Sequence, residues 1–573
     1  MTTRSRLCAA LTAAVVLTAG HRSAAQPPLG GGPGAAPAST LSARTLIVSD
    51  GGGNIYLNDF LGATAFYSAG YTGSSAVMIN IEGHHAWNGH ETLQHISQFI
   101  TGPGGNGGTF GHPTAVAHVM GGRPNPSSST PANQQRGVAY NATLWSGAIA
   151  TTAPGNSFEI TFRSFYQPYL TALQTGIGGV KADVANGSWG DDVNASAGRT
   201  AEPRALDALV SATGKVLVFA AGNSGPGPNT VIAPASGYNV ISVAALGTDV
   251  SNPPYNSPSG FSSRGPQDVF IPSGSANGTT GSTISGGRIR VDIAAPGELL
   301  HLASTASPTA YGSGSGTSFA APLVSGGVAL MIDAGRTLNL SNSADIRVVK
   351  AVLLTSADKT AGWNNGQAPS GGVIRTTQAL DQAVGAGRMN LAQALPFYAD
   401  PASTRDVPGT TLPAPASVAA RGYDYAAVTR TGQNDYRLPD SPAATRLAVT
   451  LTWLANRGIS DFQVTNPTDA DFFDNRLANL NLQVYRLSAA GDFDTLVAES
   501  AAPYNNTEHL FLTDLPAGRY GLRVLYPNDV WNFTASTDEL YGLAWNQFAP
   551  VPEPAGILAV VVVAFVIRRR SRG

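Results

Sequence analysis

Apolar runs of strand length recur through the first two thirds of the chain. Three of them are continuously apolar: KVLVFAAGN (215–223), YNVISVAAL (238–246) and IRVDIAAPG (289–297). Such runs are typical of strands buried on both faces of a parallel sheet. Residues 319–335 and 344–357 instead carry apolar side chains at helical spacing. This alternation predicts an open α/β sheet over residues 46–397, with a site at the carboxyl ends of its strands.

The pattern changes after residue 397. A Pro-rich composition predicts a linker over 398–440. Beyond it, short segments alternate apolar and polar residues: RLAVTLTWL (446–454), NLNLQVYRL (479–487), EHLFLTDL (508–515) and GRYGLRVLY (518–526). Alternation with a period of two is typical of strands with one buried face, so we expect a β-sandwich over 441–548. The predicted fold class is α/β, followed by an all-β sandwich domain.

The first 25 residues have the composition of a secretory signal peptide. Two arginines precede an apolar run (7–19), and small residues up to Ala25 form a cleavage site. We expect cleavage after Ala25, followed by a Pro/Gly/Ala-rich linker over 26–45. The alternative for the apolar run is a short core helix.

The segment 549–573 has three parts: Pro-Glu-Pro at 552–554, an apolar run at 555–567, and an arginine-rich end. The run is shorter than the roughly 20 residues of a stable membrane span, and a basic end favours the cytoplasmic side. This arrangement resembles the PEP-CTERM sorting signal of Gram-negative bacteria. The resemblance implies an exosortase-type sorting enzyme as partner, membrane contact through the tail, and export to the cell envelope or the extracellular space. The alternative is a plain C-terminal anchor.

Charge and cysteine content narrow the functional classes. Only 12% of the residues are charged and the formal net charge is −2, so nothing suggests nucleic acid as a partner. The one cysteine, Cys8, lies in the predicted signal peptide. The mature chain is therefore expected to hold together outside the cytoplasm without disulfides.

The most specific chemical motif is GSGTSFAAPLVSG (314–326). A serine at a helix N-terminus, such as Ser318, gains from nearby backbone N–H donors and from the positive end of the helix dipole. Taken alone, Ser318 could also be only an N-cap. The full string resembles the nucleophile motif of the subtilisin-like serine proteases (subtilases), G-T-S-x-A-x-P. The resemblance implies an open, mostly parallel sheet with helices on both faces, and Ser318 as the nucleophile.

Two further segments resemble landmarks of this family. FAAGNSG (219–225) resembles the oxyanion segment, which implies that Asn223 and the backbone N–H of Ser318 donate to the tetrahedral oxyanion. One such amide contributes about 3 kcal/mol to transition-state stabilisation. NGSWG (186–190) resembles the strand that pairs with the substrate backbone by β-augmentation. The residues thereby assigned to substrate binding are Ser188, Trp189 and Gly190.

The general base is expected in GHPTAVAHVMGG (111–122), which partly matches the family pattern H-G-T-H-V-A-G. The resemblance implies that His112 takes the proton of Ser318 and returns it to the leaving amine. His118 is the rival candidate. His112 is favoured because small residues follow it at the family's offsets, although Pro113 and Ala115 depart from the pattern.

The triad acid is expected nine residues after a Thr-Gly pair, and Glu82 stands nine residues after Gly73, in place of the family's aspartate. Glutamate can also accept a hydrogen bond from the imidazole and stabilise the imidazolium, although its extra methylene requires some backbone adjustment. The alternative is an exposed loop acid beside a degraded site. Asn80 is a second departure, because an apolar strand residue is usual there.

Other polar clusters raise the question of metals. In HETLQH (90–95) the two histidines are five residues apart, whereas ligation from one helical face requires four. A zinc site is therefore disfavoured, and we expect this loop to pack beside the cleft, with Trp87 covering apolar surface. No cofactor is expected to be required. Calcium could bind the following residues, although turn chemistry explains them equally well: Asp471, Asp474, Asn475 and Asn479.

These residues together predict an exported serine endopeptidase that hydrolyses protein or peptide substrates through an acyl-enzyme. The alternative is a catalytically inactive surface or matrix binding protein on the same scaffold, and the altered surroundings of Glu82 and His112 support it. A third class is a metalloprotease, against which a failure of chelators to inhibit would argue.

Overall fold

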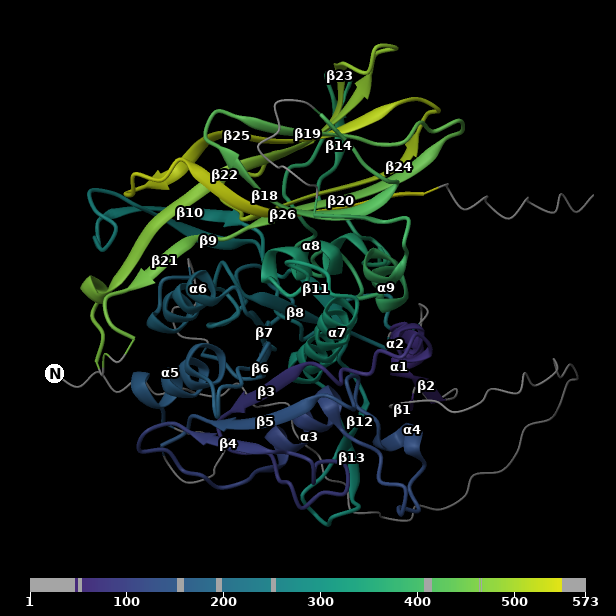
Figure 1. Cartoon of the computed structure of the whole chain (residues 1–573). Coiled ribbons are helices and arrows are strands. Elements are labelled where there is room, and N and C mark those ends of the chain that lie inside the picture. The colour runs from purple at the N-terminus through teal and green to yellow at the C-terminus, as the bar shows by residue number, and fades with distance from the viewer. Residues whose placement is uncertain are drawn as a thin grey trace, which may run out of the picture.

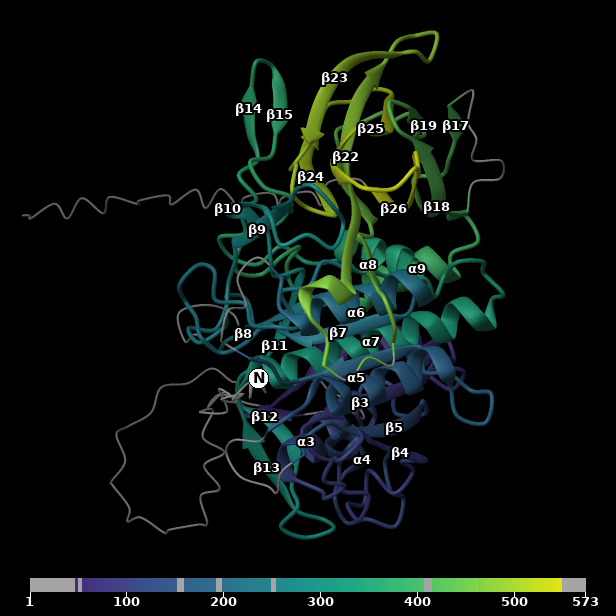
Figure 2. The ribbon, with the colours of Figure 1, turned by 90° about the vertical axis from the view of Figure 1, so that its left-hand side faces the viewer.

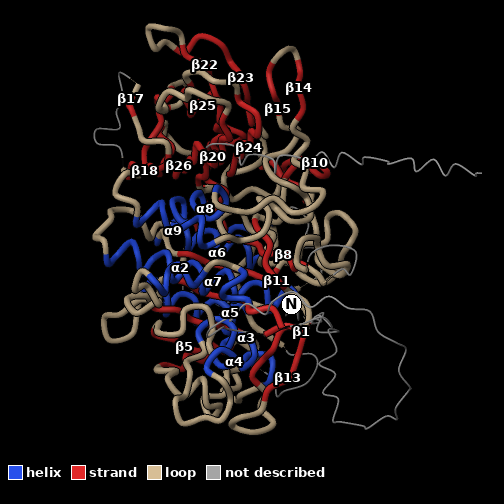
Figure 3. The backbone as a smooth tube through the Cα atoms, turned by 90° about the vertical axis from the view of Figure 1, so that its right-hand side faces the viewer, coloured by secondary structure: helices blue, strands red, loops and turns tan. Residues whose placement is uncertain are grey.

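The computed structural model describes residues 47–49, 54–151, 159–191, 198–248, 254–406, 415–462, 464 and 466–548. The predicted signal peptide (1–25), first linker (26–45) and sorting tail (549–573) lie outside the described residues. The described chain forms a first domain that contains helices and the central sheet, and a second, β-rich body that lies against it (Figure 1, Figure 3).

In the described part of the chain, a seven-stranded parallel sheet forms the centre of the first domain. Its strands, in spatial order, are β11 (Ile293–Pro296), β8 (Ile241–Leu246), β7 (Val216–Ala220), β6 (Val184–Gly187), β3 (Val77–Glu82), β5 (Thr143–Ala148) and β4 (Gln98–Thr101). The apolar runs interpreted as buried parallel strands form β7, β8 and β11, whose residues are all buried. The predicted α/β class is confirmed.

Helices flank this sheet. They are α1 (Leu57–Phe60), α2 (Ala63–Ser68), α3 (Gly111–Gly121), α4 (Ala132–Gln135), α5 (Phe162–Leu170), the π-helical turn η1 (Thr171–Thr175), α6 (Ala201–Thr213), α7 (Thr317–Thr337), α8 (Ile346–Thr355) and α9 (Leu391–Ala399). Successive strand side chains point to opposite faces. On β6, Asn186 bonds Ser325 of α7, whereas a Cβ at Gly187 would meet Tyr169 of α5. Helices α7 and α5 therefore cover opposite faces of the sheet.

The two helices predicted from apolar spacing are α7 and α8. Helix α7 is long and apolar enough to cross a membrane, by length and composition alone, but it is buried inside the fold. Two smaller sheets adjoin the first domain. Their strands are β1 (Ile47–Ser49), β2 (Asn54–Tyr56), β12 (Leu300–Ala303) and β13 (Tyr311–Gly314) in one, and β9 (Gln267–Pro272) and β10 (Gly281–Arg288) in the other.

Two mostly antiparallel sheets form the second body. The first contains β14 (Ala368–Ser370), β15 (Val373–Arg375), β23 (Phe493–Ser500), β22 (Phe472–Leu487), β25 (Tyr520–Asn532), β19 (Gln433–Arg437), β17 (Ala416–Ser417) and β21 (Asn456–Ile459). The second contains β16 (Thr404–Arg405), β18 (Arg421–Thr429), β26 (Asp538–Phe548), β20 (Thr445–Trp453) and β24 (Thr507–Leu515). A shared apolar core that includes Trp453 and Trp545 lies between them. The predicted strands at 446–454, 479–487, 508–515 and 518–526 correspond to β20, β22, β24 and β25.

The range predicted as a linker, 398–440, is partly wrong, because it contains β18 and β19. Strand β18 pairs with β26 along its whole length, and β19 pairs with β25. The prolines that suggested a linker lie at 401, 408, 413, 415 and 439. Residues 416–438, which include β18 and β19, carry no proline. Conversely, the β14–β15 hairpin precedes this range yet joins the sheet of the second body beside β23 (Figure 2).

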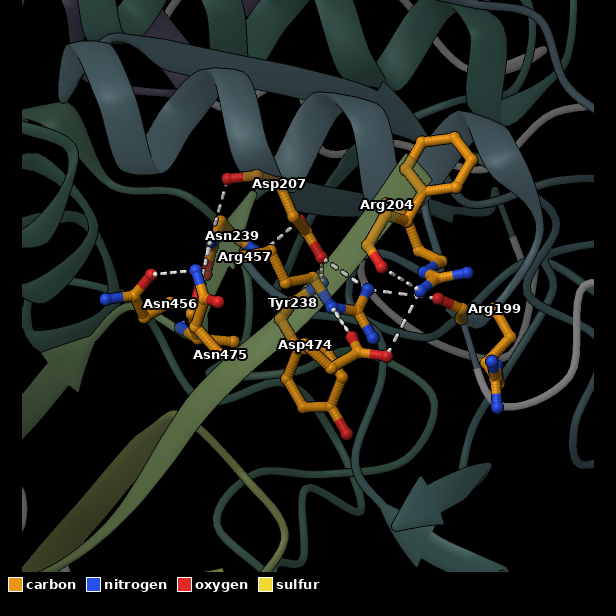
Figure 4. Close-up of polar contacts among 12 residues, drawn as sticks. Arg199, Arg204, Asp207, Tyr238, Asn239, Asn456, Arg457, Asp474 and Asn475 are labelled. Carbon is orange, nitrogen blue, oxygen red and sulfur yellow. Dashed lines mark hydrogen bonds and ion pairs between the residues drawn. The ribbon is translucent and has the colours of Figure 1, made fainter. Parts of the chain in front are cut away.

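The two bodies are in extensive contact. Helix α8 packs on β20 and β26, where a Cβ at Gly542 would stand 2.4 Å from the backbone of Arg347, so only glycine permits this approach. Beside it, β21 and β22 lie over α6 and bury a charge cluster (Figure 4). The guanidinium of Arg457 lies 2.9 Å from Asp207 of α6 and 2.8 Å from Asp474.

Candidate active site

The candidate site lies at the carboxyl ends of β3 and β6. These neighbouring strands mark the place where the order of the sheet changes direction, because β4 and β5 lie on one side and β7, β8 and β11 on the other. Ligands of open α/β sheets bind at such a switch point. Glu82 ends β3 and is 1% exposed. Its Oε1 accepts a hydrogen bond of 2.8 Å from the backbone N–H of Ser188, directly after β6.

His112 is the second residue of α3. Its Nδ1 lies 3.5 Å from Oε2 of Glu82, and its side chain is 9% exposed. The Nε2 atom is buried and has no hydrogen-bond partner among the described residues. The ring lies 5.7 Å from that of Phe319, the residue after Ser318. The structure thus brings Glu82 and His112 together, with the second imidazole nitrogen available to accept a proton.

Ser318 lies in the first turn of α7 and is partly exposed. Its Oγ donates to the carbonyl oxygen of Ser188 at 3.2 Å, and the Oγ of Ser188 donates to the carbonyl oxygen of Ser318 at 2.8 Å. The N–H groups in the first turn of a helix have no acceptor within that helix. The backbone N–H of Ser318 is therefore suited to bind an anionic oxygen.

Asn223 follows β7 and is held in one orientation. Its Oδ1 accepts hydrogen bonds of 3.0 Å from both the backbone N–H and the hydroxyl of Thr317. Because the oxygen is occupied, the Nδ2 group is left as the outward donor. A Cβ at Gly316 would stand 3.6 Å from Nδ2 of Asn223 and 3.6 Å from the backbone nitrogen of Ser318. The glycine thus leaves space between the two predicted oxyanion donors.

The segment predicted to bind the substrate backbone combines structural and available groups. The indole of Trp189 is 4% exposed, donates to the Tyr169 hydroxyl at 3.1 Å and packs edge-on against Phe165. The indole therefore belongs to the core, and only the backbone of this segment could pair with a peptide. At Gly190, a Cβ would stand 2.3 Å from the side chain of Ile232.

The rival base, His118, has different surroundings. It is fully buried, its Nδ1 accepts a hydrogen bond from the backbone N–H of Ala303, and its ring lies beside those of His90 and Tyr311. Burial, followed by the neighbouring histidines, lowers its pKa well below the ordinary value. Glu82 faces His112 instead.

The histidine-rich loop packs against α3, where the backbone N–H of Trp87 donates to the hydroxyl of Thr114 at 2.9 Å. His85 is bonded to Thr101 at 2.8 Å, and burial lowers its pKa to about 4. Within the residues that the structure describes, no three side chains of His, Cys, Asp or Glu are placed to hold a metal ion.

The four residues named for calcium do not share one site. Asp474 pairs with arginines, Asn475 donates to Asn456, and Asn479 donates to Asn528. Asp474 and Asn479 are five residues apart on β22, a separation of roughly 16 Å at the rise of a strand. The remaining member, Asp471, accepts hydrogen bonds from the backbone N–H and the hydroxyl of Thr468, which precedes the 3₁₀ helix η3 (Asp469–Asp471).

Sequence reasoning missed several polar and apolar contacts. Asn80 was noted only as a departure, yet it donates to the carbonyl oxygen of Pro113 and accepts from Asn186. The hydroxyl of Ser325 binds Asn186 from α7. Asparagine within an apolar strand was the available signal for Asn80. No motif pointed to Ile232, whose place depends on how distant loops meet.

Comparison with known proteins adds to this geometry. Residues 88–387, more than half of the chain, match the sequence model of Peptidase S8, the subtilase family. The range includes His112, Asn223 and Ser318, whereas Glu82 lies just before it. A second similarity is to Pyrolysin of Pyrococcus furiosus, with 29% identity over 256 residues. The match covers 40% of this chain and 16% of Pyrolysin, so the chain spans only a small part of that relative.

Proposed function

The chain belongs to the subtilase family, and from this premise we propose that it is a serine endopeptidase acting through an acyl-enzyme. The observation that carries the proposal is the contact of 3.5 Å between Glu82 and His112. These side chains come from different elements and meet at the strand ends, beside the segment that holds Ser318. A histidine acting as general base needs an acid that holds one ring nitrogen and a second ring nitrogen free to take a proton.

In the proposed reaction, the Ser318 hydroxyl rotates from Ser188 toward Nε2 of His112. His112 takes the proton while Oγ attacks the peptide carbonyl carbon, and the C–N bond breaks as His112 gives the proton to the leaving amine. Water, deprotonated by the same imidazole, then attacks the acyl carbon; the ester bond to Oγ breaks, the carboxylic acid leaves, and Oγ takes the proton back from His112. The negative oxygen of each tetrahedral intermediate is held by Nδ2 of Asn223 and the backbone N–H of Ser318.

Glu82 acts in this scheme as the triad acid. Since Ser188 occupies Oε1, Oε2 is the oxygen that faces the imidazole. The 3.5 Å distance is longer than an ordinary N–H···O bond, and catalytic hydrogen bonds often shorten only when substrate is bound. A negative Oε2 favours the tautomer with the proton on Nδ1 and stabilises the imidazolium.

The substrate is proposed to be a protein or peptide, whose extended backbone would pair with the segment 188–190. Export to the envelope or the extracellular space is proposed from the signal-peptide composition and the tail that resembles PEP-CTERM. An exosortase-type partner and membrane contact rest on that resemblance. Deletion of residues 549–573 should release the protein from the membrane fraction, and unchanged fractionation would contradict this part of the proposal.

The test of the activity is labelling by a fluorophosphonate probe, which reacts with activated serines. The purified protein should be labelled at Ser318, as mapped by mass spectrometry, and the Ser318→Ala variant should not. Labelling of a folded Ser318→Ala variant at the same rate would refute the assignment of the nucleophile. A folded wild-type protein that neither labels nor cleaves peptides would favour the inactive binding scaffold.

A further inference from the structure

We infer that Asn80 is a positioning residue, which links the backbone of Pro113, next to the proposed general base, to the backbone of the proposed nucleophile through a buried chain of hydrogen bonds. The inference rests on the proposed function, because it assigns Asn80 a part in the geometry of that reaction. Asn80 lies on β3, two residues before Glu82, and is 1% exposed. It is therefore on the same face of the strand as the acid.

The first link joins β3 to α3. Nδ2 of Asn80 donates to the carbonyl oxygen of Pro113 at 3.1 Å. Pro113 directly follows His112, so this bond anchors the turn of the helix that carries the base. The contact holds His112 relative to the same strand that presents Glu82.

The next links cross from β3 to β6 and then to α7. Nδ2 of Asn186 donates to Oδ1 of Asn80 at 3.3 Å and to Oγ of Ser188 at 3.1 Å. The Ser188 hydroxyl in turn donates to the carbonyl oxygen of Ser318 at 2.8 Å. The chain therefore runs without a gap from the residue after the base to the nucleophile itself.

This chain has one consistent arrangement of donors and acceptors. The carbonyl oxygen of Pro113 can only accept, so the Asn80 amide must turn its NH2 group toward it and its oxygen toward Asn186. Both hydrogens of the Asn186 amide are then used, while its oxygen accepts from the Ser325 hydroxyl at 2.9 Å. Rotating either amide by half a turn would place two acceptors or two donors face to face.

Directional bonds fix distances that apolar packing leaves free. Asn186 is fully buried, Ser188 is 2% exposed, and most other residues of β3 and β6 are apolar and buried. Burial of this chain costs desolvation, which its bonds offset only when all are made. A misplacement of about 1 Å in an active site can cost roughly 10²-fold in rate. A chain that fixes both α3 and α7 to the sheet limits such displacement.

The test uses Asn80→Leu, which keeps the approximate shape of the side chain and removes both bonds. With a peptide substrate, kcat should fall about 10- to 100-fold while KM stays within about twofold, because the peptide-binding segment is not changed. The matched control is Ser242→Ala, which removes a fully buried hydroxyl on β8 of the same sheet that makes no hydrogen bond to this chain. Its kcat should stay within about twofold of wild type. An equal loss in this control, or an unchanged kcat in folded Asn80→Leu, would overturn the inference.

Ser188→Ala provides a second test if Asn80→Leu does not fold. This variant cuts the chain at its other end and keeps the backbone groups that bind Glu82 and Ser318, so a folded variant with unchanged kcat would also overturn the inference. In the double variant, the losses should be far from additive, because either substitution interrupts the same chain. Additive losses in kcat would show that the two residues act independently and would also overturn the inference. An inactive, unlabelled wild-type protein would instead refute the proposed function itself, which separates the two failures.

Discussion

Ser318 and Ser188 exchange two hydrogen bonds, each hydroxyl donating to the carbonyl oxygen of the other residue. Ser318, the proposed nucleophile, is thereby held next to the segment expected to bind the substrate backbone. In the proposed reaction this hydroxyl must leave the Ser188 carbonyl to reach His112. If Ser318 is the nucleophile, the structure shows a resting arrangement, in which the proposed reacting hydroxyl is bonded to the Ser188 carbonyl.

Removal of the charge of Glu82 should show whether this residue serves as the triad acid. Glu82→Gln keeps the length of the side chain but loses the negative charge that favours a proton on Nδ1 of His112. We expect kcat to fall by about 10³- to 10⁴-fold, as for other triad acids. Glu82→Asp keeps the charge and should retain more activity than Glu82→Gln. Measured kcat values in the opposite order, or a fully active Glu82→Gln, would exclude this role.

The side chain of Ile232 should limit the residue accepted at the cleaved bond. A Cβ at Gly190 would stand 2.3 Å from Cδ1 of Ile232, and one at Gly222 would stand 2.9 Å from its Cγ2. The isoleucine thus lies between the segment 188–190, which is proposed to bind peptide, and the turn before Asn223. We expect a substrate with its carbonyl oxygen at Asn223 and its backbone along 188–190 to place the side chain of the cleaved residue near Ile232.

We therefore expect wild-type cleavage after small residues such as alanine. Ile232→Gly should raise the kcat/KM ratio of a leucine or phenylalanine substrate to an alanine substrate by about tenfold or more. Ile232→Val, which removes one methyl group, should change the ratio by less. The measurement is kcat/KM for peptides that differ only at the cleaved residue. An unchanged ratio in active Ile232→Gly would show that the side chain binds elsewhere.

The charge cluster between α6 and β22 should be essential for the stability of both bodies (Figure 4). Burial disfavours the charge of Arg457, but the carboxylates of Asp474 and Asp207 raise its pKa above the ordinary value. Arg457→Met would remove the cation that pairs with Asp207 and would leave Asp474 with Arg204, at 3.5 Å, as its cation. It should lower the free energy of unfolding by about 3–5 kcal/mol. Chemical denaturation measures this loss. Arg519→Met is the control, since its pair with Asp440 is exposed and worth about 0–1 kcal/mol.

The sequence predicted what depends on local pattern and missed what depends on distant neighbours. The buried strands β7, β8 and β11 and the helix beginning near Ser318 follow from apolar runs, apolar spacing and a motif, each of which lies within one short stretch of the sequence. The contact of Asn80 with Asn186 requires β6 to lie beside β3, although β4 and β5 intervene in the chain. Likewise, the sequence of β18 does not indicate a strand, because its partner, β26, lies more than 100 residues away.

Buried histidines should make the protein less stable in mild acid, and His301 is a clear case. Its ring is stacked on that of Tyr311 with centroids 4.7 Å apart. Its Nε2 is buried without a hydrogen-bond partner in the part of the chain that the structure describes. Burial, assisted by the charge of His90, lowers the pKa of His301 to about 4. In the unfolded chain the ordinary pKa is about 6.5.

Between pH 6.5 and 4, the unfolded state therefore binds a proton that the folded state excludes, so the free energy of unfolding falls as the pH falls through this window. His301→Phe keeps the stacking and cannot be protonated. Glu508, whose pKa burial raises to about 8, acts in the opposite sense, so the variant must be compared with wild type. The wild-type loss between pH 7.5 and 4.5 should exceed that of His301→Phe by about 1–3 kcal/mol. Equal losses in denaturation curves at the two pH values would show that His301 is protonated in the folded state.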